Sequence, residues 1–337
     1  MDKLLDRLRR KHFLSIGRAG MDFYPEPPGT EIEHATHFSA HVGGSAGNIA
    51  VALAKLRCQA ELLTCFSDDA IGRFTTNKLN EFGVGTAHCR VVGGEARNTL
   101  AVAETRLENC QSVIYRNGAA DFEMNSSDVD GPDYDTVGGV ILSGTALANE
   151  PSRAAIFHAI DRATAAGAPV VIDMDYRPYS WTSPEDAASV YSTALSQCDI
   201  VIGNDVEFGV AAGGYGLGRD YAAGLLAGGV SIVVYKMGHR GSATLTKGAS
   251  FDTGIFPVSA LKPTGAGDAF MGGLMAGLAN AMSVEDAVIQ GSAAAALVVT
   301  RVACSTAMPT PEELLRFLNS HTLSEIRSGD SHEHSAV

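Results

Sequence analysis

Four short apolar segments decide the fold of this chain: VILSG (140–144), VVIDMD (170–175), DIVIGN (199–204) and SIVVYKMG (231–238). Each is rich in β-branched residues and short enough to be a buried strand, and helical patterns at about 151–166, 184–196 and 219–228 separate them. Strands that alternate with helices predict a parallel, doubly wound sheet that helices cover on both faces.

The same alternation continues toward both ends of the chain. Strands are predicted at 12–17 (HFLSIG) and 61–66 (ELLTCF), and helices are predicted at 45–56, 70–82, 267–281, 284–300 and 311–319. Helices are missing from two regions, about 18–43 and about 89–117, and the second reads as consecutive strands in CRVVGG, NTLAVAETRL and SVIYRNG. Consecutive strands predict a small antiparallel sheet beside the main one. We therefore expect one α/β domain over residues 1–322 and a disordered tail over 323–337.

Composition narrows the classes of function. The chain has 337 residues and a formal net charge of -13, which argues against nucleic acid and against an anionic membrane surface as partners. The six cysteines form no CxxC pair, so we expect them to be reduced and buried. The N-terminal segment is too charged for a secretory signal, and no apolar run approaches the roughly 18 residues of a membrane span. We expect a cytoplasmic protein.

The sharpest chemical motif is KPTGAGDAFMGGLMAGL (262–278), in which a glycine-rich turn runs directly into a helix. Backbone N–H groups of Gly265, Ala266 and Gly267 can approach an anion closely there, and the helix N-terminus adds partial positive charge. This pattern predicts an anion hole for a phosphoryl group. Asp268 follows in the first turn, where it is placed to take a proton from an attacking hydroxyl; the alternative is that it only caps the helix.

Three further motifs accompany this turn. VGGSAGNIAVALAKL (42–56) opens a helix with Asn48 in its first turn, which offers a donor and an acceptor to a hydroxyl. Asn204 and Glu207 follow a strand three residues apart, which suits either Mg²⁺ bound through its waters or a helix capping box. Gly238 and Gly241 in KMGHRGS (236–242) suit a turn that passes close to a ligand, or a plain hairpin. The P-loop motif is absent, and GAGDAF lacks the third glycine of a dinucleotide fingerprint.

Together and in this order, the four motifs resemble the ribokinase-like (PfkB) sugar kinases, over about residues 13–319. The resemblance implies an ATP- and Mg²⁺-dependent kinase in which the small sheet is a lid that pairs with a second copy to make a homodimer. The roles that it implies fall on Asp268 as the catalytic base, Gly265, Ala266 and Gly267 as the anion hole, Asn204 and Glu207 for Mg²⁺, Asp22, Gly43, Gly44 and Asn48 for the substrate, and Asn204, Lys236, Gly238 and Gly241 for the nucleotide.

One position departs from the family pattern. Many ribokinase-like enzymes carry an aspartate six residues before the base, where it helps to bind potassium, and this chain has Lys262 there. The resemblance therefore leaves activation by a monovalent cation such as potassium open.

A narrower resemblance concerns the substrate. GRAGMDFYP (17–25), SGTALANEPSR (143–153), DMDYRPYSW (173–181) and ACSTAMPTPEEL (303–314) are similar to a branch of the family that phosphorylates the C6 hydroxyl of 5-dehydro-2-deoxy-D-gluconate in inositol catabolism. A sugar acid needs a fixed cation for its carboxylate, ideally arginine. Arg177, directly after a strand, and Arg116, in the predicted lid, are the candidates; the alternative for each is a structural ion pair.

Other functions stay open at this point. A kinase for 2-keto-3-deoxygluconate, or for a neutral sugar such as fructose or ribose, fits the same motifs. A sugar-sensing protein without catalytic activity is an alternative of another class, against which the retained Asp268 counts.

Overall fold

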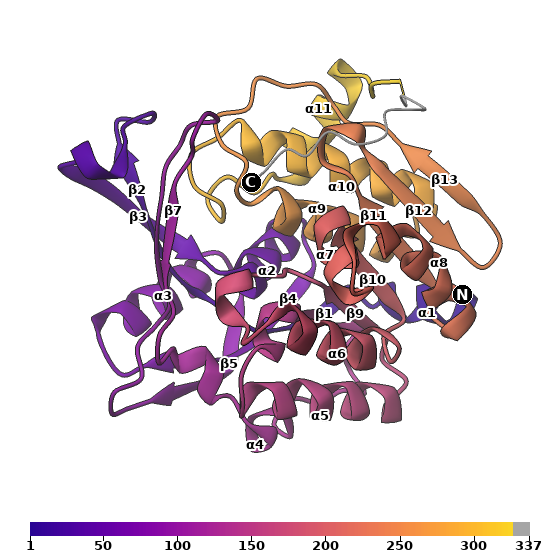
Figure 1. Ribbon diagram of the computed structural model, residues 1–337, viewed down its shortest axis with the longest axis horizontal. Coiled ribbons are helices and arrows are strands. Elements are labelled where there is room, and N and C mark those ends of the chain that lie inside the picture. Colours follow the sequence, from indigo (N-terminus) through magenta and orange to yellow (C-terminus); the bar gives the residue numbers. More distant parts are fainter. Residues whose placement is uncertain (326–337) are drawn as a thin grey trace.

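A computed structural model describes residues 1–325 of the chain and contains a nine-stranded sheet in the order β13-β12-β11-β10-β9-β8-β1-β4-β5 (Figure 1). Neighbouring strands from β5 to β11 run parallel, and β12 and β13 add an antiparallel edge. The doubly wound, mainly parallel sheet is therefore confirmed. The strand bounds are β1 His12–Ile16, β4 Gln59–Ser67, β5 Gly85–Val92, β8 Gly139–Ser143, β9 Val170–Asp173, β10 Ile200–Asn204, β11 Ile232–Lys236, β12 Ser242–Thr246 and β13 Ser250–Thr253.

Helices cover both faces of this sheet (Figure 1). Alternate strand residues point to opposite faces, so in β1 Phe13 joins one apolar core and Leu14 the other. The core containing Phe13 is closed by α1 Asp2–Leu8, α2 Ser45–Lys55, α3 Ala70–Glu81, α9 Ala266–Ala279, α10 Val284–Val299 and α11 Pro311–Ser320. The core containing Leu14 is closed by α4 Ser126–Val129, α5 Ser152–Ala165, α6 Pro184–Leu195, α7 Asp205–Ala211 and α8 Gly218–Gly228.

The strand order reverses beside β1, and this fixes where a ligand can bind. From β1 the chain moves through β4 to β5 on one side, whereas β8 lies on the other side of β1 and leads on to β9, β10 and β11. Connections therefore leave in opposite directions at the carboxyl ends of β1 and β8. In open α/β sheets the resulting crevice is the usual ligand site.

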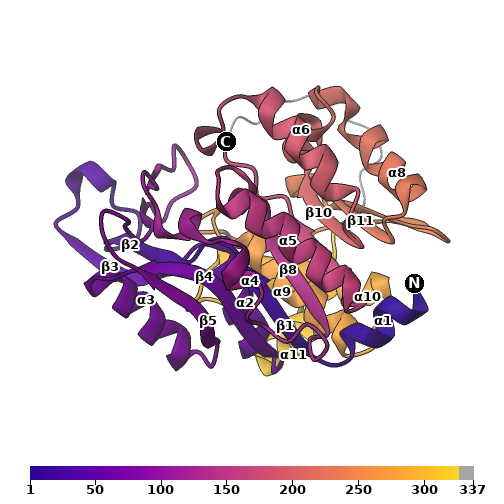
Figure 2. The ribbon, with the colours of Figure 1, turned by 90° about the horizontal axis from the view of Figure 1, so that it is seen from below.

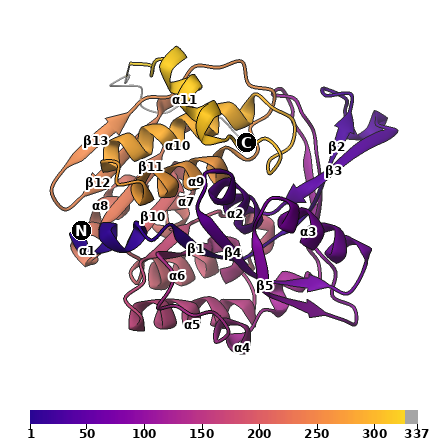
Figure 3. The same ribbon diagram turned by 180° about the vertical axis from the view of Figure 1, so that it is seen from behind.

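A small four-stranded sheet projects from one side of the molecule, as Figures 2 and 3 show. Its order is β3-β2-β6-β7, with bounds β2 Gly20–Glu26, β3 His37–Gly43, β6 Leu100–Ala103 and β7 Ser112–Tyr115. Two details of the prediction were wrong. The small sheet is mixed, because β2 and β6 pair in parallel, and the segment CRVV belongs to β5 at the edge of the main sheet. Strand pattern alone gives neither the direction nor the partner of a pairing.

The C-terminal end of the described chain packs on the domain. Ser324 N–H donates to the Ile255 carbonyl at 2.8 Å, so the chain is still packed on the domain there, and residues 326–337 of the expected tail lie outside the described residues. The six cysteines are free, as expected, and four of them are buried. Within the described chain, no helix is long and apolar enough to cross a membrane.

Candidate active site

Asp268 lies in the first turn of α9, which begins directly after the glycine-rich turn. Gly265 caps this helix with φ +83°, a left-handed conformation that suits glycine, and a Cβ there would lie 2.7 Å from the Cys304 Sγ. The turn is therefore closed against the loop that follows α10. The N–H groups of Ala266 and Gly267 begin the helix, so they and its positive dipole end lie beside the Asp268 carboxylate.

The N-terminus of α2 lies beside the N-terminus of α9. The buried Asn48 side chain in α2 donates from its Nδ2 to the Asp268 Oδ2 at 2.7 Å. One turn further along, a Cβ on Gly272 would lie 2.4 Å from the Ala52 Cβ, so α2 and α9 run side by side in the same direction. Two helix dipoles thus direct their positive ends toward one carboxylate. The Asn48 Oδ1 is buried and has no partner among residues 1–325.

The pKa of Asp268 is raised to about 7. Burial is the largest cause, and the neighbouring charge of Asp175 acts in the same direction. The hydrogen bond from Asn48 and the charges of Arg177 and Arg18 oppose the shift. A carboxyl group with a pKa near neutrality is a far better proton acceptor than an ordinary exposed aspartate.

The residues predicted to contact the substrate gather beside this carboxylate. Asp22 lies in β2 of the small sheet, and a Cβ on Gly43 in β3 would come 1.9 Å from its Oδ1, so only glycine leaves room for the carboxylate. Gly44, with φ +85°, packs on the backbone of Arg18. Burial raises the pKa of Asp22 to about 6, although Arg18, a hydrogen bond from Tyr24 and Lys262 each lower it.

The carboxyl ends of β9 and β10 contribute further carboxylates. Asn204 Oδ1 accepts from the Glu207 N–H at 2.9 Å, and Glu207 Oε2 accepts from the Asn204 N–H at 2.7 Å, which is a complete capping box. The second oxygen of the buried Glu207 accepts from the Tyr176 N–H at 3.1 Å. Burial raises the pKa values of Asp173 and Glu207, and each carboxylate lies within electrostatic range of the charge of Asp175. The capping-box interpretation of Asn204 and Glu207 is therefore confirmed, and the motif also faces other acidic groups.

Lys236 ends β11 and reaches toward the same place. Its Nζ lies 3.8 Å from the Asp173 Oδ1 and 3.5 Å from the point that a Cβ on Gly267 would occupy. The turn that follows is a short 3₁₀ segment in a hairpin between β11 and β12. Gly241 approaches the Thr253 carbonyl so closely that a Cβ would lie 2.0 Å away, whereas a Cβ on Gly238 would meet open space.

Both predicted arginines are engaged in ion pairs. Arg177 Nη2 lies 2.7 Å from the Asp175 Oδ1, and Ser45 donates to the other oxygen of Asp175 at 2.6 Å. Burial would raise the pKa of Asp175, but Arg177, Arg18 and the Ser45 hydroxyl hold it below its ordinary value.

Arg116 is more deeply enclosed than Arg177. Its guanidinium pairs with the buried Asp121, donates to the Thr145 carbonyl at 3.2 Å and lies over the Phe122 ring. Although Arg116 comes from the segment that follows β7, it is within electrostatic range of Asp175.

Two charged residues of the site were missed by sequence reasoning. Asp175 pairs with Arg177 and lies within electrostatic range of Arg18 and Arg116, and Arg18 follows β1 at the crevice. Each lies at the carboxyl end of a predicted strand, in the segments DMDYRP and GRAGMD, so strand-end position was an available signal. Ser45, which donates to Asp175, lies 130 positions earlier in the chain, and no local pattern identifies such a partner.

Lys262, the departure from the family pattern, is fully buried. Its Nζ donates to the Thr264 carbonyl at 2.6 Å and lies 4.0 Å from the Cys304 Sγ. A fixed cation is therefore held against the backbone of the glycine-rich turn.

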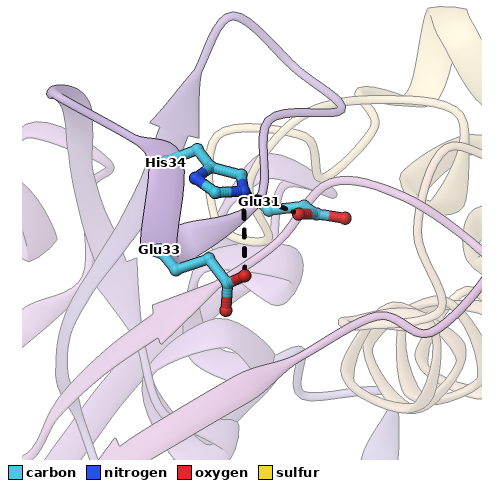
Figure 4. Close-up of side chains that lie close together, drawn as sticks. All are labelled: Glu31, Glu33 and His34. Carbon is cyan, nitrogen blue, oxygen red and sulfur yellow. Dashed lines mark ion pairs between the residues drawn. The ribbon is translucent and has the colours of Figure 1, made fainter.

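A cluster of metal-binding residue types lies away from this region. In the part of the chain that the structure describes, Glu31, Glu33 and His34 are the only such group whose ligand atoms gather closely, and Figure 4 shows them at the tip of the small sheet. Glu33 and His34 are exposed, and Glu31 also pairs with Arg106 at 2.7 Å. These groups form ordinary surface ion pairs.

Residues 10–311 match the pfkB family of carbohydrate kinases. The chain belongs to this family. A pfkB kinase transfers a phosphoryl group to an alcohol, so the expected enzyme class is confirmed. Among curated relatives of the family, the 5-dehydro-2-deoxygluconokinase of Photobacterium profundum is 38% identical over 310 residues, which cover 90% of this chain and 94% of that protein. The protein of the same name from Geobacillus kaustophilus is 34% identical over 323 residues, covering 94% and 96%.

A solved structure shows the same pfkB fold. A double mutant of the fructokinase of Vibrio cholerae O395, with fructose, ADP and a potassium ion bound, is 25% identical to this chain. The two superpose with a TM-score of 0.81, covering 91% of this chain and 98% of that one. The fold expected from the sequence is thus found in a sugar kinase of known structure.

Proposed function

We propose that this pfkB kinase transfers the γ-phosphoryl group of ATP to the C6 hydroxyl of 5-dehydro-2-deoxy-D-gluconate, in the catabolism of inositol. One observation carries the reaction type: the Asp268 carboxylate, with its pKa raised to about 7, lies at the mouth of α9 beside Asn48. The names of the curated relatives support the substrate. The arginines around Asp175 support an acid over a neutral sugar.

The proposed chemistry is a direct transfer. Asp268 accepts the proton of the C6 hydroxyl as that oxygen forms its bond to the γ-phosphorus, while the bond from phosphorus to the bridging oxygen of ADP breaks. The N–H groups of Gly265, Ala266 and Gly267 and the start of α9 stabilise the charge on the phosphoryl oxygens. Asp22, Gly43, Gly44 and Asn48 hold the sugar acid, and Lys236, Gly238 and Gly241 lie along the nucleotide.

The acidic residues at the ends of β9 and β10 fit a divalent cation. The pKa values of Asp173 and Glu207 are raised, so their ionised forms lack a sufficient counter-charge, and Lys236 alone opposes the shift of Asp173 from close by. Asn204 and Glu207 would hold Mg²⁺ through its waters, with Asp173 beside them. When bound, Mg²⁺ neutralises charge on the β- and γ-phosphates.

The buried Lys262 supports the proposal that this kinase needs no potassium. The Vibrio cholerae fructokinase was solved with potassium. In this chain a buried ammonium already contacts the Thr264 carbonyl in the glycine-rich turn. A tethered cation supplies fixed positive charge behind the anion hole at any potassium concentration.

The small sheet has two unlike faces, which supports a lid that also forms a dimer. Alternation along β2 directs Asp22 and Tyr24 to one face, and their contacts put that face toward the active site. The opposite face is apolar and open: Phe38 is 40% exposed, Val113 43% and Tyr115 61%. Such a surface is typical of an interface with another chain, and a second copy meeting it through the same face would cover both.

A substrate panel tests the proposal. Purified protein would be incubated with Mg-ATP and with 5-dehydro-2-deoxy-D-gluconate, 2-keto-3-deoxygluconate, fructose or ribose, and ADP release would be followed. We expect the highest kcat/KM for the first acid. A preference for fructose or ribose would refute the sugar-acid assignment, and binding of an acid without ADP release would favour a sensor.

A further inference from the structure

Arg18 is a buried cation without a partner. It follows β1 at the crevice of the main sheet, and its side chain is 7% exposed. Within residues 1–325 its guanidinium makes no hydrogen bond and no ion pair, and its Nε is buried without an acceptor. An unpaired charge inside a protein costs several kcal/mol, so such groups are kept mainly where a ligand completes them.

The other two arginines of the site each have a protein partner, although among the described residues the Nε of Arg116 also lacks an acceptor. Arg177 is paired with Asp175, and Arg116 is paired with Asp121 and bonded to the Thr145 carbonyl. Their donors facing those groups are already occupied by the protein. The five N–H donors of Arg18 have no such acceptors, and a planar fork of this kind matches the two oxygens of a carboxylate.

The surroundings place Arg18 inside the substrate region. Its charge lowers the pKa values of Asp22, Asp175 and Asp268, so it lies within electrostatic range of all three. Within residues 1–325 it bonds to none of them, so its donors remain available to a ligand. Arg18 also precedes Ala19, whose backbone packs against Gly44 at the start of α2.

We propose that Arg18 binds the carboxylate of the sugar acid through two parallel hydrogen bonds and is the residue that makes this kinase select an acid. The proposal rests on the proposed function. The carboxylate and the reacting hydroxyl are at opposite ends of the substrate, which fits a cation near Asp268 that is not bonded to it. Arg177 and Arg116 then hold Asp175 and the lid segment in place around the bound acid.

The test compares a charged and a neutral form of one substrate. Kinetics would be measured with the sugar acid and with its primary amide for the wild type, Arg18→Met, Arg18→Lys and the control Arg162→Met. Arg162 is an exposed arginine that pairs with Asp130, outside the site. Thermal unfolding of each variant would be recorded with and without the acid.

The two substrates should respond differently. We expect Arg18→Met to raise KM for the acid by roughly 10- to 100-fold and KM for the amide by less than about threefold, because only the acid loses charge-assisted hydrogen bonds. Arg18→Lys should recover part of the loss, since a point charge replaces the fork. The acid should raise the melting temperature of the wild type but not that of Arg18→Met. Without ligand, Arg18→Met should melt no lower than the wild type, because an unpaired buried charge has been removed.

The outcomes separate this proposal from the proposed function. Equal losses with acid and amide, mainly in kcat, would mean that Arg18 contacts the transferred phosphate, and would overturn the carboxylate role. A marked fall in melting temperature without ligand, with unchanged selectivity, would make Arg18 structural and would also overturn it. If the wild type itself prefers neutral sugars, the proposed function fails, whatever the variants do.

Discussion

Replacing Asp268 by asparagine should change both the stability and the pH dependence of this kinase in a predictable direction. The pKa of Asp268 is raised from 3.8 to about 7 by burial and by Asp175. The folded chain therefore holds this proton more tightly than the unfolded chain. A group of this kind lowers stability as pH rises from about 4 to about 7, and the loss persists at higher pH. A side-chain amide at this position cannot ionise, so the variant escapes this loss and can still accept the hydrogen bond from Asn48.

The magnitude follows from linkage. One pKa unit corresponds to about 1.4 kcal/mol, so the full shift sets a ceiling of about 4 kcal/mol. The Asp268 side chain is only partly buried, and solvent screens part of the charge. We therefore expect the variant to be more stable than the wild type by about 1–2 kcal/mol at pH 8, with a difference near zero at pH 4. For a chain of 337 residues that is a difference in melting temperature of about 1.5–3 °C.

The assay is thermal unfolding of both proteins from pH 4 to pH 8, with the exposed Asp6→Asn as a control. In parallel, wild-type kcat/KM should rise through pH about 7 as Asp268 loses its proton. Asp268→Asn should lose that rising limb and about 10²- to 10⁴-fold of turnover. A difference in melting temperature between the two proteins that does not change from pH 4 to pH 8 would refute the raised pKa. Near-wild-type turnover in the variant would refute the role of Asp268 as base.

Three further outcomes are expected. Arg177→Ala should raise KM for the sugar acid about tenfold and KM for fructose little, because Asp175 loses its partner at the acid site; steady-state kinetics with both sugars measures this, and equal effects would contradict it. Wild-type turnover should be the same in potassium and in tetramethylammonium buffers, and Lys262→Met should lower it about tenfold; a wild-type rate that depends on potassium would contradict the role of this lysine. Phe38→Glu with Tyr115→Glu should shift the protein from dimer to monomer in analytical ultracentrifugation, and a wild type that is already monomeric would remove the interface.

The main sheet and the order of the motifs could be predicted from the sequence, because both depend on local signals. β-branched runs such as Val170–Asp173 favour strands by themselves, and Gly265 favours the left-handed conformation that its turn needs. The direction of β6 could not be predicted in this way. It pairs in parallel with β2, and β3, α2, β4, α3 and β5 lie between the two strands in the sequence, so no local signal sets the direction of the pairing.

The ion pairs of the site could not be predicted from local sequence patterns either. The sequence left two interpretations of Arg116 and Arg177, a cation for the substrate carboxylate or a structural ion pair, and the fold gives each a carboxylate partner. Asp175 also receives a hydrogen bond from Ser45, 130 positions earlier in the chain. Residue type and strand-end position identified candidates for the site. Which of them keeps donors for a ligand depends on contacts that exist only in the folded chain.

A protein with net charge -13 must still attract two anionic substrates, and the titration of its buried groups explains how. The pKa of Asp268 is raised to about 7 and that of Asp173 is also raised, because burial disfavours their charged forms. Each carboxyl group therefore keeps its proton over a wider pH range than an exposed aspartate does. Arginine stays charged throughout this range, and in the described part of the chain no anion is bonded to Arg18. The region around Asp268 is therefore more positive than its residue types suggest.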